Sequence, residues 1–88
     1  MKMKKGFILK NIASKWIVVP VGEKAVHFNG LLTLNESGRM LFELLQEGDT
    51  TIEMLIKRIT DVYDIDKETA RLDVESFIHK LQDKDLIE

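Results

Sequence analysis

The chain has 88 residues, of which 44% are hydrophobic and 32% charged, and its formal net charge is −2. This composition is typical of one small globular domain and unlike that of a disordered segment. The absence of cysteine excludes disulfides, thiolate metal ligands and cysteine nucleophiles. No apolar run approaches the roughly 20 residues of a membrane span. We therefore expect a single cytoplasmic domain covering residues 1–88, with a frayed segment 1–6 and no membrane contact.

The charge is unevenly distributed along the chain. Residues 1–30 carry six lysines against Glu23, whereas the remainder carries seven basic and fourteen acidic residues. This asymmetry has two interpretations. In the first, the lysines are solvent-exposed residues of a sheet, and the acidic residues lie on ordinary solvated helix faces. In the second, the basic half of the chain attracts acidic segments of a partner.

The first third of the chain predicts strands. Phe7 to Ala13 forms the first, a turn follows at Ser14-Lys15, and Trp16 to Val21 forms the second. Pro20 lacks a backbone donor and is therefore expected at a strand end or a bulge. After a loop that contains an Asn-Gly turn signal, Leu31 to Leu34 forms the third strand.

The second strand is apolar on both faces. Trp16 and Val18 share one face, and Ile17 and Val19 share the other. Helices can cover only one face of a small antiparallel sheet. We therefore expect another surface to cover part of the second face.

Three helices follow the third strand. The first helix is predicted to begin after an N-cap at Asn35 and to end at Gly48. Thr50 with Glu53 matches a capping box at the start of the second helix, and Asp66 predicts the N-cap of the third. Apolar residues then recur at helical spacing, which predicts a bundle packed on the sheet. In the second helix the apolar run is Ile52, Leu55, Ile56, Ile59 and Val62; in the third it is Ala70, Val74, Phe77, Ile78 and Leu81.

No catalytic constellation is present. The two histidines, His27 and His79, fall in a loop and on the side of a helix away from its core stripe. The acidic residues between Asp61 and Glu68 lack the glycine and the ligand spacing of a calcium loop. The glycines form no phosphate-binding pattern. We expect a protein that is not an enzyme and has no metal site and no cofactor.

The succession of strands and helices also suggests a winged helix, and hence a DNA-binding regulator. A recognition helix presents basic residues to phosphates. Residues 66–88 instead carry seven acidic and four basic residues. We therefore expect no nucleic-acid partner, and keep the winged-helix regulator as an alternative. A structural subunit that dimerises through its edge strand is a third hypothesis; the expected state is a monomer or weak dimer.

Several segments together resemble the family of the coenzyme PQQ synthesis protein D, over about residues 7–88. They are Trp16–Gly22, Phe28–Gly38, Leu44-Leu45 with Glu47-Gly48, Tyr63-Asp64, Asp73-Val74, Phe77-Ile78 and Leu81. The resemblance implies an α+β, winged-helix-like fold with a three-stranded antiparallel sheet followed by a three-helix bundle. It also implies a peptide-modification chaperone, which presents the leader of a ribosomally made precursor peptide to a modifying enzyme, often a radical S-adenosylmethionine protein.

In that family the leader docks between the third strand and the third helix. Strand addition would use backbone groups, here those of Leu31, Leu32, Thr33 and Leu34. Helical spacing leaves two candidate walls for the groove. One wall comprises Arg71, Glu75, Ile78 and Gln82; the other comprises Asp73, Ser76 and Lys80. We favour the first, because Ile78 supplies an apolar floor and Arg71 a partner for an acidic leader residue.

A second surface is predicted for the modifying enzyme. Leu72 projects nearly opposite the core stripe of the third helix. Together with Trp16 and Val18 of the second strand, it would form an exposed docking patch.

Overall fold

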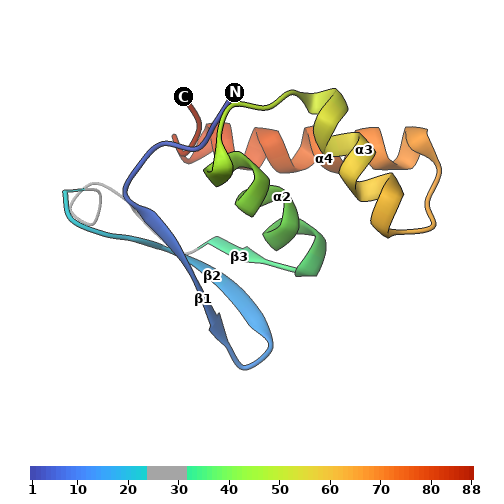
Figure 1. Cartoon of the computed structure of the whole chain (residues 1–88). Helices are drawn as coiled ribbons and strands as arrows, with labels where there is room; N and C mark the ends of the chain where they lie inside the picture. The colour runs from blue at the N-terminus through green and yellow to red at the C-terminus, as the bar shows by residue number, and fades with distance from the viewer. Residues whose placement is uncertain (24–31) are drawn as a thin grey trace.

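The computed structural model describes residues 1–23 and 32–88, in which three strands precede three helices (Figure 1). The predicted α+β fold, an antiparallel sheet followed by a helical bundle, is confirmed. The predicted site residue Leu31 lies outside the described residues, as does His27. The elements are β1 (Phe7–Ile12), β2 (Lys15–Pro20), β3 (Leu32–Leu34), α2 (Glu36–Glu47), α3 (Ile52–Val62) and α4 (Lys67–Asp83).

A two-residue turn at Ala13-Ser14 joins β1 to β2. Both residues have positive φ, 51° and 68°, which is the left-handed geometry of a type I′ hairpin turn. The predicted turn at Ser14-Lys15 was therefore wrong by one residue. The reason is chemical, since this turn usually contains Asn-Gly, and a sequence with Ala-Ser carries no such signal.

The sheet has the order β1-β2-β3, with β2 antiparallel to both neighbours. Its inner face packs on the helices and its outer face is turned away from them (Figure 1). Among the side chains that point inward, Phe7, Val18, Leu32 and Leu34 are buried in the core. Pro20 is the last residue of β2, as predicted, so its missing N–H interrupts no central pairing.

Side-chain caps start all three helices. Asn35 accepts a hydrogen bond from the N–H of Gly38 at 2.8 Å, and Asp66 accepts one from Thr69 at 2.7 Å, as predicted. The second cap was predicted one residue too early. Thr51 accepts from the N–H of Met54, whereas Thr50 is buried and its N–H donates to the Met1 carbonyl.

The apolar stripe of α4 forms the centre of the bundle, because all five of its predicted residues are buried. In α3 Leu55, Ile56 and Ile59 of the stripe are buried and Ile52 is partly buried, but Val62 is 54% exposed and lies outside the core. Among the residues described, no helix combines the length and apolar character needed to cross a membrane.

The prediction that residues 1–6 fray is wrong. Met3 is buried and pairs with Ile87 in an isolated antiparallel bridge. Its N–H donates to the Leu45 carbonyl, and the N–H of Lys4 donates to the Leu86 carbonyl. The segment is ordered by partners that lie far away in the sequence, which a local pattern does not reveal; the two ends of the chain lie side by side (Figure 1).

The cap of α4 predicts a pH dependence. The hydrogen bond from the backbone N–H of Thr69 lowers the pKa of Asp66 below its ordinary value of 3.8. A lowered pKa stabilises the folded state at neutral pH, and this contribution is lost as pH falls through the folded-state pKa. Asn caps as well as Asp without titrating. Asp66→Asn is therefore expected to melt near wild type at neutral pH but to lose less melting temperature on acidification, as measured by circular dichroism. Equal losses would show that this cap does not contribute to acid denaturation.

Candidate functional site

The free edge of the sheet next to the helices belongs to β3. Which backbone groups point to that edge follows from the pairing of β2. The tight hairpin pairs Ile12 with Lys15, and farther along Val21 donates its N–H to the Gly6 carbonyl at 2.8 Å. Backbone groups of a strand alternate between its two sides. Lys15, Ile17 and Val19 therefore bond to β1, and the intervening residues of β2 bond to β3.

This alternation determines the orientation of β3. Trp16 lies opposite Leu34, and Val18 lies opposite Leu32, so both leucines direct their backbone groups into the sheet. Thr33 between them directs its N–H and C=O to the open edge. Its side chain is exposed, whereas both leucine side chains are buried. Within the described part of β3, Thr33 alone presents backbone hydrogen-bonding groups to an added strand.

A groove of about 570 Å³ adjoins the end of this edge. It lies where β3 passes into α2, and three helices contribute to its walls. Apolar side chains and a polar rim both line it, a combination that suits a peptide side chain with a polar neighbour. The lining residues are Asn35, Glu36, Ser37, Gly38, Leu41, Ile59, Tyr63, Ile65, Asp73, Ser76, Phe77 and Lys80.

The wall that α4 contributes combines charge with an apolar surface. Phe77 is buried and forms part of the apolar lining. Asp73, Ser76 and Lys80 are exposed around it. Because Asp73 and Lys80 are about two helical turns apart, they place opposite charges at two ends of the wall.

The wall favoured from the sequence does not line this groove. Arg71 is bound to Glu53 of α3 at 2.5 Å, so this flank of α4 faces the start of α3. Ile78 is buried in the core, and Glu75 and Gln82 are exposed without lining the groove. The other flank, with Asp73, Ser76 and Lys80, lines it.

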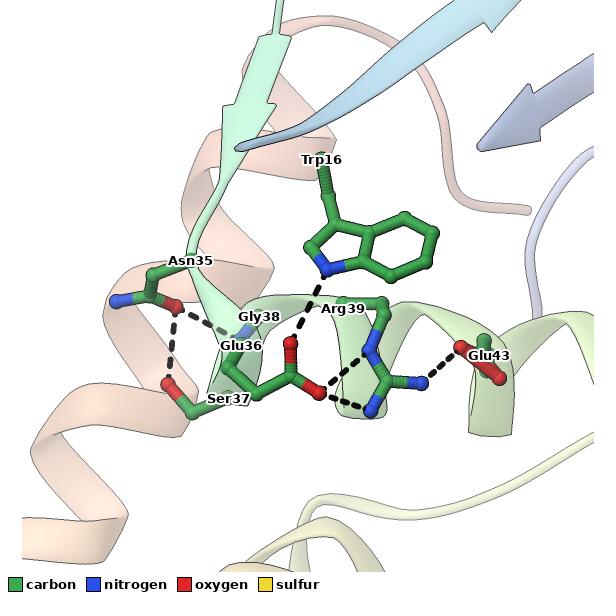
Figure 2. A network of polar contacts seen from close by, with 7 residues as sticks. All are labelled: Trp16, Asn35, Glu36, Ser37, Gly38, Arg39 and Glu43. Atoms are coloured by element: carbon green, nitrogen blue, oxygen red, sulfur yellow. Dashed lines mark hydrogen bonds and ion pairs between the residues drawn. The ribbon is translucent and has the colours of Figure 1, made fainter. Parts of the chain in front are cut away.

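A polar network fixes the junction between β3 and α2 (Figure 2). Besides capping the helix through Gly38, the side-chain oxygen of Asn35 accepts a hydrogen bond from the Ser37 hydroxyl at 3.0 Å. Gly38 is closely packed, because a Cβ there would lie 3.3 Å from the Cβ of Leu34 and 3.2 Å from the Asn35 oxygen. The first turn of α2 is thus held directly against the end of the edge strand.

The same network connects α2 to β2. Figure 2 shows the Trp16 indole N–H donating to Glu36 at 3.1 Å, and the Arg39 guanidinium between Glu36 and Glu43. The guanidinium also lies 5.2 Å from the centre of the Trp16 ring, within cation–π range. Arg39, and to a smaller extent Trp16, lower the pKa of the Glu36 carboxyl below its ordinary value of 4.5. Glu36 therefore stays ionised at the rim of the groove.

The predicted docking patch of Trp16, Val18 and Leu72 does not form as expected. Val18 is fully buried, so its side chain is not available to a partner. Trp16 is half-buried and points toward α2, where it meets Glu36. Leu72 is 70% exposed, as expected from helical spacing. The error lay in choosing the inner face of β2 instead of the outer one.

Sequence reasoning missed the contribution of the strand–helix junction to the groove. The only available signal was the position of the Asn35 cap directly after the edge strand, which places the first turn of α2 beside it. Ile59 was missed because helical spacing describes it as a core residue, and Tyr63 and Ile65 were missed because they follow the end of that helix. Among the described residues, no group of three histidine or acidic side chains is arranged to hold a metal ion.

The fold and site define the chain as a small α+β domain with an open sheet edge beside a groove. Residues 15–87 match the family described as coenzyme PQQ synthesis protein D, and the chain belongs to this family. No curated protein sequence matches it significantly.

Two solved structures share the fold. One is titled TbiB1 in complex with the TbiA(beta) leader peptide; it has a TM-score of 0.77 and 23% identity over 100% of this chain and 95% of that chain. The other is titled lasso peptide synthetase B1 complexed with the leader peptide. Its TM-score is 0.68 and its identity 12%, over 93% of this chain and 89% of that chain.

Proposed function

We propose that this protein binds the leader segment of a ribosomally synthesised precursor peptide and presents the peptide to a modifying enzyme. The observation that carries the proposal is the open edge at Thr33 beside a groove lined by α4. Family membership and the two leader-bound structures of the same fold support it. The role of the chain is binding, and the partner type expected from the family is a radical S-adenosylmethionine enzyme.

The geometry explains how one short edge can be selective. A leader residue paired with Thr33 exchanges two backbone hydrogen bonds, which require no particular side chain. The residues before and after it project to the inner face of the sheet, because side chains alternate along a strand. That face is the one that is turned toward the helices (Figure 1). The backbone of β3 thus supplies affinity, and the apolar lining around Phe77 supplies a pocket for an alternate side chain.

The charged rim supplies orientation. Asp73 and Lys80 lie at different ends of the α4 wall, and Glu36 stays ionised at the α2 side of the groove. A leader with a basic residue near Asp73 and an acidic residue near Lys80 is favoured over one with the reverse order. The energy of such exposed pairs is small, so they select direction more than they add affinity.

A backbone amide NMR titration tests this function. The probe is the leader of the precursor peptide encoded nearest to the gene, with a DNA duplex as control. We expect shifts to concentrate at Thr33, at Asn35–Gly38 and along Asp73–Lys80, with no response to DNA. Shifts confined to Arg71 and Gln82 would restore the opposite flank of α4. A response of α4 to DNA and none to the leader would favour the winged-helix regulator.

A further inference from the structure

The outer sheet face is a second surface that the leader site does not use. We define it by the outward residues of β1 and β2. The register places Ile8 beside Val19, Lys10 beside Ile17 and Ile12 beside Lys15, all on one face. Ile8 is 40% exposed and Ile12 is 54% exposed, while Ile17 and Val19 are partly exposed.

This face lacks the polar character of a solvated sheet face. An antiparallel sheet that packs on helices on one side usually alternates between apolar inward and polar outward residues. Here four of the six outward residues of β1 and β2 are isoleucine or valine. The three described helices lie on the other side of the sheet (Figure 1). Contiguous apolar surface of this kind marks an interaction site.

The charges on this face indicate its occupant. Its two charged residues, Lys10 and Lys15, are both basic and exposed. Neither forms an ion pair with any other residue in the described ranges 1–23 and 32–88. Two copies of the chain placed face to face would bring lysines against lysines, which disfavours a symmetric dimer through this face. An apolar surface rimmed by carboxylates would complement both features.

We propose that the outer sheet face docks the peptide-modifying enzyme, through an apolar surface of that enzyme bordered by acidic side chains. This inference rests on the proposed leader-binding function. The exposed side chain of Thr33 belongs to the same face, because it lies opposite Ile17. A leader strand added at Thr33 would extend this face by one strand, which places the bound peptide next to the docked enzyme.

The test compares two variants of this face with a matched control. Ile12→Asp removes exposed apolar surface, and Lys10→Glu reverses a charge without changing the apolar residues. Leu72→Asp is the control, because Leu72 is 70% exposed on α4 and lies outside this face. The probes are the purified radical S-adenosylmethionine enzyme encoded nearest to the gene, measured by biolayer interferometry, and the fluorescent leader, measured by anisotropy.

We expect both outer-face variants to weaken enzyme binding by about tenfold or more, in the range of central interface residues. Their leader affinity should stay within about twofold of wild type, and the control should change neither affinity. Circular dichroism verifies folding, and Lys10→Glu keeps the test decisive if Ile12→Asp unfolds.

Three outcomes would overturn the inference. Enzyme affinity unchanged in both variants would show that the face is not the docking surface. Concentration-dependent dimers that Ile12→Asp abolishes would assign the face to a second copy. Binding to anionic phospholipid vesicles that Lys10→Glu abolishes would assign it to a membrane. Failure of the leader function gives a different result, because the wild-type protein would then bind no leader in the anisotropy measurement.

Discussion

Thr33→Pro is expected to weaken leader binding by about tenfold or more while leaving the domain folded. Thr33 directs its N–H to the open edge, so proline removes a donor that no strand of the sheet uses. A backbone hydrogen bond contributes a net free energy of about 0.5–1.5 kcal/mol, and 1.4 kcal/mol is a tenfold change in affinity. The proline ring also obstructs the approach of a neighbouring strand. Anisotropy of a labelled leader measures the loss.

Thr33→Ala is the matched control. It removes the exposed side chain and keeps the backbone donor, so leader affinity should stay close to wild type. Melting temperatures of the two variants separate a binding defect from a folding defect. Equal affinities of Thr33→Pro and wild type would exclude strand addition at this residue.

The second large effect is expected at the groove wall. Ser76 is exposed and lines the groove beside Phe77, so Ser76→Trp places an indole where the leader side chain would enter. We expect leader affinity to fall by about tenfold or more, because the apolar anchor of the peptide loses its pocket. Isothermal titration calorimetry compares the leader affinity of the folded variant with that of the wild type.

Glu75→Trp is the control for that variant, since Glu75 is the exposed neighbour on α4 and does not line the groove. Successive residues of a helix point about 100° apart, so the same bulky side chain is turned away from the peptide. Leader affinity should be unchanged. If Glu75→Trp were the variant that blocked binding, the leader would lie along the flank of Arg71 and Gln82.

Sequence patterns predicted the helices well because their signals are local. The caps at Asn35 and Asp66 and the apolar stripe of α4 each depend on residues within a few positions. The first two strands were also found, with ends that differ from the structure by one residue. Hairpin geometry caused one of these errors, because Ala13 and Ser14 adopt positive φ without the glycine that usually marks it.

The features that local patterns do not decide depend on distant contacts. Helical spacing identifies two flanks of α4, but only packing against α3 and the start of α2 decides which flank lines the groove. The apolar character of β2 was visible on both faces. Which face lies inside is set by the pairing and by the helices, and Val18 was assigned outward although it is fully buried.

The joined ends of the chain have a consequence for synthesis. Residues 2–4 form backbone hydrogen bonds with Leu45, Leu86 and Glu88, and the last two of these partners leave the ribosome almost a whole domain's length later. The N-terminal segment therefore lacks these backbone partners until α4 and the residues after it have been synthesised. Because Leu86 is fully buried, the domain completes its core only after the residues around Leu86 have left the exit tunnel. A nascent chain stalled within α4 would expose its sheet to other proteins.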